Sequence, residues 1–119
     1  MMTENTDKQS DPVTTDTGDE MLSFALIAAA GQARSLSFEA LEAAREKDFD
    51  RAHKLMDQAK AAALEAHNQQ TELLVREAQG DHTAVDVMLV HAQDHLMTAM
   101  LAQELIEQMI YLHQELARR

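Results

Sequence analysis

Apolar residues recur at helical spacing over almost the whole chain after residue 19, and polar segments interrupt the pattern at two places. The first periodic segment predicts a helix over residues 20–47. Its apolar side consists of Met21, Phe24, Leu26, Ile27, Ala30, Ala33, Leu36 and Leu41. Gly31 lies inside this segment, although an interior glycine costs about 1 kcal/mol relative to alanine. A glycine among so many alanines indicates that a neighbouring helix approaches closely there.

A second helix is predicted from Asp48 to about Gln79. Asp48 is a natural N-cap because its carboxylate can accept hydrogen bonds from free backbone N–H groups. Gly80 follows the last periodic residue and is typical of a helix C-cap. The row that recurs at spacings of three and four consists of Phe49, Ala52, Met56, Ala59, Ala63, Ala66, Gln70 and Leu74.

A third helix is predicted over residues 84–117, with Asp81 or Thr83 as its N-cap. It is apolar around much of its circumference, through Val87, Val90, Leu96, Met97, Met100, Leu101, Leu105, Ile106, Met109, Ile110, Leu112 and Leu116. Three long helices joined by tight turns predict an all-α, antiparallel, up-down-up bundle in residues 19–119. Such a bundle buries one stripe per helix, so the wider apolar surface of the third helix indicates contact with other copies of the chain.

The segment before the helices has a different composition. Residues 1–18 are polar and acidic and contain the single proline, Pro12, so we expect a disordered tail. The chain has no cysteine, which fits a reducing compartment and excludes thiol nucleophiles. Without an apolar signal region or an uninterrupted stretch of eighteen apolar residues, we expect a cytoplasmic protein that does not insert into a membrane.

The charge balance narrows the classes of partner. The net charge is −11, with 21 acidic and 10 basic residues. Nucleic acid is therefore a poor partner, because neutralising phosphates requires a basic surface. Aromatic residues make up only 3% of the chain, which argues against base-stacking or sugar-stacking platforms.

The candidate chemistry lies in the third predicted helix, at His91, Asp94 and His95. His91 and Asp94 are three residues apart, and His91 and His95 are four apart, so all three side chains can reach one locality. His91 and Asp94 also occupy the two alternate positions of a heptad seam, which is polar in its first half and apolar in its second half. A carboxylate on an apolar seam is costly unless it is paired or coordinated.

Three interpretations follow from these residues alone. They can be a metal site, but one helix does not readily converge three ligands on an ion, and no second Glu-x-x-His set is present. They can be structural, as hydrogen-bonded residues of a helix interface. They can also form a phosphoryl carrier, because a neutral imidazole accepts a phosphoryl group on nitrogen and needs no nucleotide-binding loop.

A resemblance bears on this choice. The stretches "GQARSLSFEAL", "MDQAKAAALEAHNQQTELL" and "LVHAQDHLMTAMLAQELI" resemble, in that order, the lactose/cellobiose/N,N'-diacetylchitobiose class of enzyme IIA of the bacterial sugar phosphotransferase system. The resemblance covers about residues 20–117. It implies that the histidine opening HAQDH, here His91, is phosphorylated at Nε2 by HPr and passes the group to a cysteine of the cognate enzyme IIB.

The resemblance also implies a homotrimer with the third helices around its axis. The aspartate of HAQDH, here Asp94, would lie on that axis in three copies and bind one divalent metal ion, for which Mg²⁺ is the expected species. Gln93 and His95 are candidates for supporting the phosphohistidine, and Thr98 is expected to be satisfied by its own helix. The alternative function is a non-catalytic trimeric scaffold with a structural metal at Asp94, and the transported sugar is not determined.

Overall fold

The computed structural model describes residues 17–119, which form three helices and no strand. They are α2 (Thr17–Arg45), α3 (Phe49–Ala78) and α4 (Val87–Ala117). Residues 1–16, most of the predicted tail, lie outside the described residues. Helix α2 begins three residues before the predicted start, and Asp19 and Glu20 in its first turn favour that start through the helix dipole.

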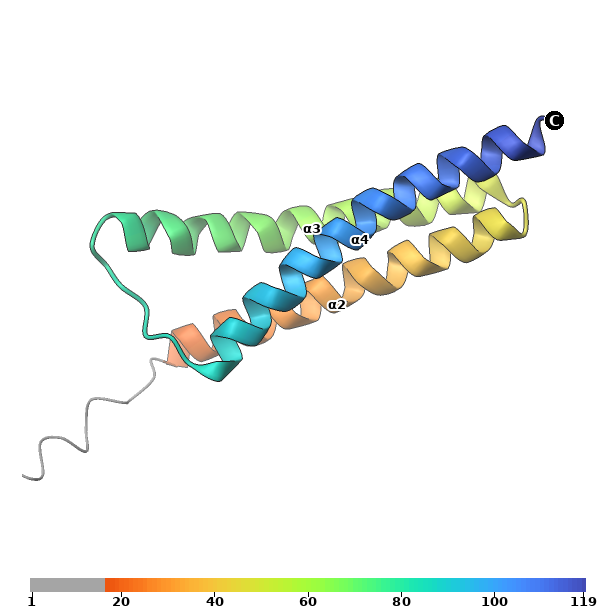
Figure 1. Cartoon of the computed structure of the whole chain (residues 1–119). Coiled ribbons are helices and arrows are strands. Elements are labelled where there is room, and N and C mark those ends of the chain that lie inside the picture. Colours follow the sequence, from red (N-terminus) through yellow and green to blue (C-terminus); the bar gives the residue numbers. More distant parts are fainter. Residues whose placement is uncertain (1–16) are drawn as a thin grey trace, which may run out of the picture.

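The helices form the predicted up-down-up bundle (Figure 1). Helices α2 and α4 run in the same direction, and α3 runs antiparallel to both. Helix α2 is the central element, because it contacts each of the other helices extensively while α3 and α4 contact each other least. The starts of α2 and α4 and the end of α3 therefore lie at one end of the bundle.

The turn between α2 and α3 is very short. The N–H of Asp48 donates to the carbonyl of Ala43 at 2.9 Å and that of Lys47 to Ala44 at 3.0 Å, which closes α2 with a Schellman motif. Lys47 takes the left-handed position of this motif, with φ of 65°, a position that glycine usually fills. Asp48 then accepts from the N–H of Arg51 at 3.2 Å and caps α3, as predicted.

The connection between α3 and α4 ends later than the sequence pattern predicts. Gly80, with φ of 91°, follows the end of α3 and confirms the predicted glycine stop. Helix α4 begins at Val87 instead of Ala84, and its N-cap is Asp86, which accepts from the N–H of Leu89 at 2.8 Å. The prediction of Asp81 or Thr83 as the cap is therefore wrong.

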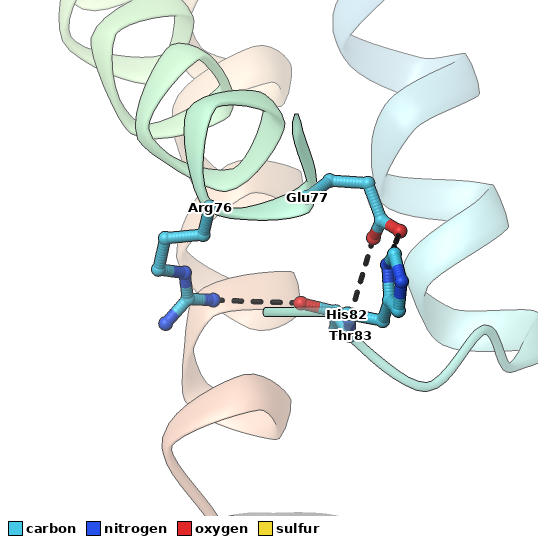
Figure 2. A network of polar contacts seen from close by, with 4 residues as sticks. All are labelled: Arg76, Glu77, His82 and Thr83. Carbon is cyan, nitrogen blue, oxygen red and sulfur yellow. Dashed lines mark hydrogen bonds and ion pairs between the residues drawn. The ribbon is translucent and has the colours of Figure 1, made fainter. Parts of the chain in front are cut away.

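A polar network explains why Thr83 cannot cap α4 (Figure 2). The backbone N–H of Thr83 donates to Glu77 at 3.3 Å, and its hydroxyl accepts from Arg76 at 3.5 Å. His82 pairs with the other carboxylate oxygen of Glu77. Arg76 also lies 3.8 Å from Asp19 at the start of α2. These contacts hold residues 82–83 against the end of α3, so the chain turns into α4 only three residues later.

The core consists largely of alanine, which lets the helix axes approach closely. One buried cluster contains Leu26, Ala30, Ala66, Ala92, Leu96 and Ala99, and the other contains Ala40, Ala43, Ala44, Ala52, Met56, Ala59, Ile106 and Ile110. Three residues predicted for apolar packing rows are exposed instead. Met21 and Phe24 lie on the outer side of α2, and Leu73 takes the buried place predicted for Leu74, because the step from Gln70 along α3 is three residues.

Helix α2 is apolar enough, by length and composition, to cross a membrane, with a mean hydropathy of 1.2 over its most apolar stretch. This is weak evidence for a span. Its alanines at positions 30, 33, 40, 43 and 44 are fully buried between α3 and α4. Packing against two other helices therefore accounts for the apolar character of its buried face, whereas Met21, Phe24 and Phe38 are exposed.

The outer face of α4 is apolar although neither α2 nor α3 covers it. The exposed large side chains on this face are Val87, Val90, Met97, Leu101, Leu105, Met109, Leu112 and Leu116. Asp94 is exposed at the same face, about 180° around the helix from the buried row centred on Ala92, Leu96 and Ala99. The extra apolar surface predicted for the third helix is thus a continuous exposed stripe.

Candidate functional site

His91 and His95 stack on each other on successive turns of α4. Their ring centroids are 5.8 Å apart and their planes differ by 12°. His91 is exposed, whereas His95 is half-buried. Helical spacing of four residues produces this arrangement, because such side chains are neighbours on one face. The pair therefore presents one accessible imidazole, that of His91, whose ring stacks on the half-buried ring of His95.

The half-buried ring of His95 faces Gly31 of α2. A methyl group at Gly31 would lie 3.6 Å from Nε2 of His95, which is ordinary van der Waals contact. No other atom of the described residues outside α2 lies within 4 Å of such a methyl group, so the prediction that close helix packing calls for a glycine at position 31 is not supported. Neither histidine ring has a hydrogen-bond partner within residues 17–119. Their ring nitrogens are nevertheless not buried from solvent. Solvent accordingly reaches these nitrogens.

Gly31 is the middle member of a row along α2. Phe24 and Phe38 lie seven residues before and after it, so the three positions nearly superpose when viewed down the helix. Phe24 is 59% exposed and Phe38 is 48% exposed. The guanidinium of Arg34 lies 5.3 Å from the centre of the Phe38 ring. The surface beside the histidine pair thus carries two exposed aromatic rings with a gap between them.

Asp94 does not join the two histidines. It points about 60° away from His91 around α4, at the exposed apolar face. Within residues 17–119 there is no group of three or more His, Asp or Glu side chains able to hold a metal ion. The interpretation that His91, Asp94 and His95 of one chain ligate a single ion is therefore not supported by the geometry.

Thr98 is satisfied by its own helix, as predicted. Its hydroxyl donates to the carbonyl of Asp94 at 3.0 Å and is also 3.1 Å from the carbonyl of His95. The hydroxyl proton is consequently used within α4.

Gln93 faces α3 instead of the histidines. Its side-chain oxygen accepts a hydrogen bond from the amide of Gln70, whose nitrogen also lies 3.6 Å from the sulfur of Met97. Gln93 is about 160° away from His91 around the helix, so it does not reach the His91 ring of its own chain. Gln70, which is only 7% exposed, was not predicted as part of the site. The signal for it is a polar residue in an otherwise apolar row of α3.

Cavities in the bundle lie elsewhere. One of about 550 Å³ opens between the start of α2 and the second half of α3, and it contains neither histidine. A second, of about 430 Å³, is a shallow hollow on α2 lined by Arg34, Ser35, Phe38, Glu39 and Glu42. The accessible imidazole therefore sits on an open surface, which suits a protein partner better than an enclosed small molecule.

Comparison with known proteins agrees with this geometry. Residues 21–114 match the family described as the lactose/cellobiose-specific IIA subunit of the PTS system. The chain is 48% identical over 97 residues to the N,N'-diacetylchitobiose-specific EIIA component of Escherichia coli K12, covering 82% of this chain and 84% of that protein.

Solved structures give the same result. The cellobiose-specific enzyme IIA of Bacillus anthracis superposes with a TM-score of 0.84 at 42% identity, covering 89% of this chain and 96% of that one. A chain of the IIA(Chitobiose)–HPr complex of the Escherichia coli phosphotransferase system gives 0.72 at 47% identity, covering 82% and 95%. The three-helix chain with the stacked histidine pair belongs to the lactose/cellobiose-specific IIA family, the phosphotransferase components that take part in the phosphoryl relay of the sugar phosphotransferase system.

Proposed function

We propose that this protein is a phosphoryl carrier in which Nε2 of His91 accepts a phosphoryl group from phospho-HPr and passes it to a cysteine of its cognate enzyme IIB. The observation that carries the proposal is the exposed imidazole of His91, stacked on His95 in a member of this family. The system would serve uptake of a sugar of the β-glucoside, chitobiose or lactose type.

The chemistry needs only a positioned nucleophile. A lone pair on neutral His91 forms a bond to phosphorus while the bond between phosphorus and its donor atom on HPr breaks. In the second step, the thiolate of enzyme IIB takes the phosphoryl group and the imidazole leaves as a neutral ring. Each step exchanges one bond to phosphorus for another, so positioning supplies most of the catalysis.

HPr is the expected donor because a related IIA chain has been solved in complex with it. The two exposed phenylalanines, Phe24 and Phe38, flank the position opposite His95 and offer apolar contact on an acidic chain. Docking for phosphoryl relay must be transient, and a small apolar patch made of two exposed rings fits a small, short-lived interface. We therefore propose this aromatic row of α2 as part of the HPr-docking surface.

We further propose that three copies associate through the exposed stripe of α4. Three parallel α4 helices around an axis would bury Leu101, Leu105 and Leu112, each at least 50% exposed in the single chain. Burying large apolar side chains is the main driving force for such association. His91 lies on one flank of this stripe and Gln93 on the other, so a neighbouring copy would bring its Gln93 flank toward His91.

The same arrangement would gather three Asp94 carboxylates at the axis. The surroundings of Asp94 fit a metal ligand. Its carboxylate is exposed, unpaired within the described residues, and surrounded on its face of α4 by apolar side chains. Three oxygen donors suit a hard cation such as Mg²⁺, which would offset the mutual repulsion of the carboxylates. We propose one such ion per trimer, with a structural role.

A cytoplasmic location is proposed with this function. The absence of cysteine fits a reducing compartment. The acidic surface, with a net charge of −11, favours protein partners over nucleic acid.

Incubation with phospho-HPr tests the carrier function. Wild type should acquire a phosphate that is labile in acid and stable in base, and His91→Ala should acquire none. His67→Ala is the matched control, because His67 is an exposed histidine on α3 away from the pair. Equal labelling of His91→Ala would contradict the proposal. An unlabelled wild type that loses its trimer when metal is removed would favour the non-catalytic scaffold.

A further inference from the structure

We propose that Gly31 is a positioning residue of the phosphoryl site. By carrying no side chain it leaves the Nε2 edge of His95 open, so that this nitrogen can donate a hydrogen bond to an oxygen of the phosphoryl group carried on His91. This inference rests on the carrier function proposed above and adds to it a residue on a different helix.

The geometry singles out Gly31 among the residues of α2. The nearest side-chain atom to a methyl group at this position is Nε2 of His95, at 3.6 Å. The neighbouring members of the same row are the large residues Phe24 and Phe38, so the row has a gap at Gly31, beside His95. An interior glycine lowers helix stability by about 1 kcal/mol relative to alanine, which is a cost that packing does not explain here because alanine fits.

His95 is suited to the donor role. Its ring is half-buried and stacks on His91 at 5.8 Å, which fixes it relative to the accepting ring. Within residues 17–119 its nitrogens bond to no other group, so they are free to bond to a phosphoryl oxygen. Hydrogen bonds to a charged acceptor are stronger than those between neutral groups. The donated bond forms only when the phosphoryl group is present, so it aids acceptance of the group.

Gly31→Ala separates this role from a structural one. The methyl group makes only van der Waals contact with His95 and raises helix propensity, so the variant should fold and be at least as stable as wild type. It should nevertheless accept phosphate from phospho-HPr more slowly, by about tenfold, because the methyl covers the approach to Nε2 and one charge-assisted hydrogen bond is lost or weakened. Gln58→Ala, at an exposed position of α3 outside the aromatic row, is the control and should transfer at the wild-type rate.

A spectroscopic readout addresses the hydrogen bond directly. In ¹⁵N spectra of the histidine rings, phosphorylation of His91 should shift the Nε2 resonance of His95 in wild type and shift it much less in Gly31→Ala. His95→Gln, which keeps a donor, should retain more of the transfer rate than His95→Leu, which has none. The resonance comparison would not respond to a merely structural role of Gly31, and the two His95 variants show whether a donor at position 95 is needed.

The outcomes distinguish this inference from the function on which it rests. If His91→Ala is labelled like wild type, the carrier proposal itself fails. If His91 is the acceptor but Gly31→Ala transfers at the wild-type rate, or the His95 resonance shifts equally in both proteins, the carrier function stands and the role of Gly31 is overturned.

Discussion

The side-chain amide of Gln70 on α3 donates a hydrogen bond to the side-chain oxygen of Gln93 on α4, across the interface where the helices of the bundle touch least. Gln70 is buried, whereas Gln93 is half-buried. A polar contact therefore joins two helices that share few other contacts, at the level of the histidine pair along α4. It orients the side of α4 opposite to His91.

Gln70→Leu removes this hydrogen bond and should lower the free energy of unfolding by about 1 kcal/mol, the usual net value of one bond, because Gln93 can partly turn to water. Urea denaturation at a fixed protein concentration measures the change. Gln58→Leu, at an exposed position of the same helix, should change stability much less. Equal stabilities of wild type and Gln70→Leu would show that the contact contributes nothing net.

Lys47 occupies a left-handed backbone position between α2 and α3. A side chain there costs about 1–2 kcal/mol in local strain, but glycine also gains entropy in the unfolded chain. Lys47→Gly should therefore stabilise the protein by less than about 1 kcal/mol, and Lys47→Val should destabilise it by about 1–2 kcal/mol. Thermal unfolding tests both. Glu46→Gly, where φ is not positive, should be destabilising, and a stabilising effect there would contradict the argument.

The network at the start of α4 should make stability depend on pH (Figure 2). The hydrogen bond from His82, and then that from the backbone of Thr83, hold the pKa of Glu77 below its usual value of 4.5. A carboxyl whose pKa is lowered on folding contributes stability above its unfolded pKa, and that contribution is lost as the pH falls through the folded value.

Glu77→Gln should accordingly be less stable than wild type near neutral pH and equally stable in acid. Thermal midpoints of both proteins, measured from about pH 3 to pH 7, test this. Glu72→Gln is the control, because Glu72 is an exposed carboxylate on the same helix. A difference from wild type that is as large in acid as at neutral pH would show that Glu77 acts through its shape and not through its charge.

The aromatic row of α2 should matter for docking and not for folding. Phe24 is exposed, so Phe24→Asp should leave the unfolding free energy nearly unchanged. It should raise the KM for phospho-HPr by about tenfold, through loss of one apolar contact and added negative charge, with little effect on kcat. Leu64→Asp, at an exposed apolar position of α3, is the control. A fall in kcat without a change in KM would place Phe24 outside the docking surface.

Much of this fold follows from local sequence, because the helices are amphipathic and their stops are chemically distinct. Asp48 begins α3 and Gly80 follows its end, as predicted, whereas close helix packing does not call for a glycine at Gly31. The start of α4 could not be predicted in the same way. Three acceptors, at positions 81, 83 and 86, compete for the cap, and the choice depends on Glu77, which binds the loop from another helix.

Some contacts around the candidate site follow from helical spacing, and others do not. Helical spacing predicted that His91 and His95 are neighbours, and their rings stack. The same spacing placed Asp94 within reach of them, but Asp94 points about 60° away from His91, at the exposed apolar face. The orientation of Gln93 depends on Gln70 across a helix interface, which periodicity along one helix does not encode. Likewise, the apolar pattern predicts that Phe24 belongs to the core. In the structure the small alanines of α2 face the other helices, and Phe24 lies on the exposed side.

Asp94→Leu tests the axial arrangement proposed for three copies. Replacing three carboxylates by leucines removes their repulsion and adds apolar surface, so the trimer should be preserved or strengthened while Mg²⁺ binding is lost. Leu101→Asp is the opposite change on the same exposed stripe and should dissociate the trimer, because three new charges would be buried together. Sedimentation equilibrium, with and without a chelator, measures both effects. Chelation should weaken the wild-type trimer and leave that of Asp94→Leu unchanged. If Asp94→Leu were monomeric, Asp94 could not lie at the axis, and the stripe on α4 would have to pack against something other than its own copies.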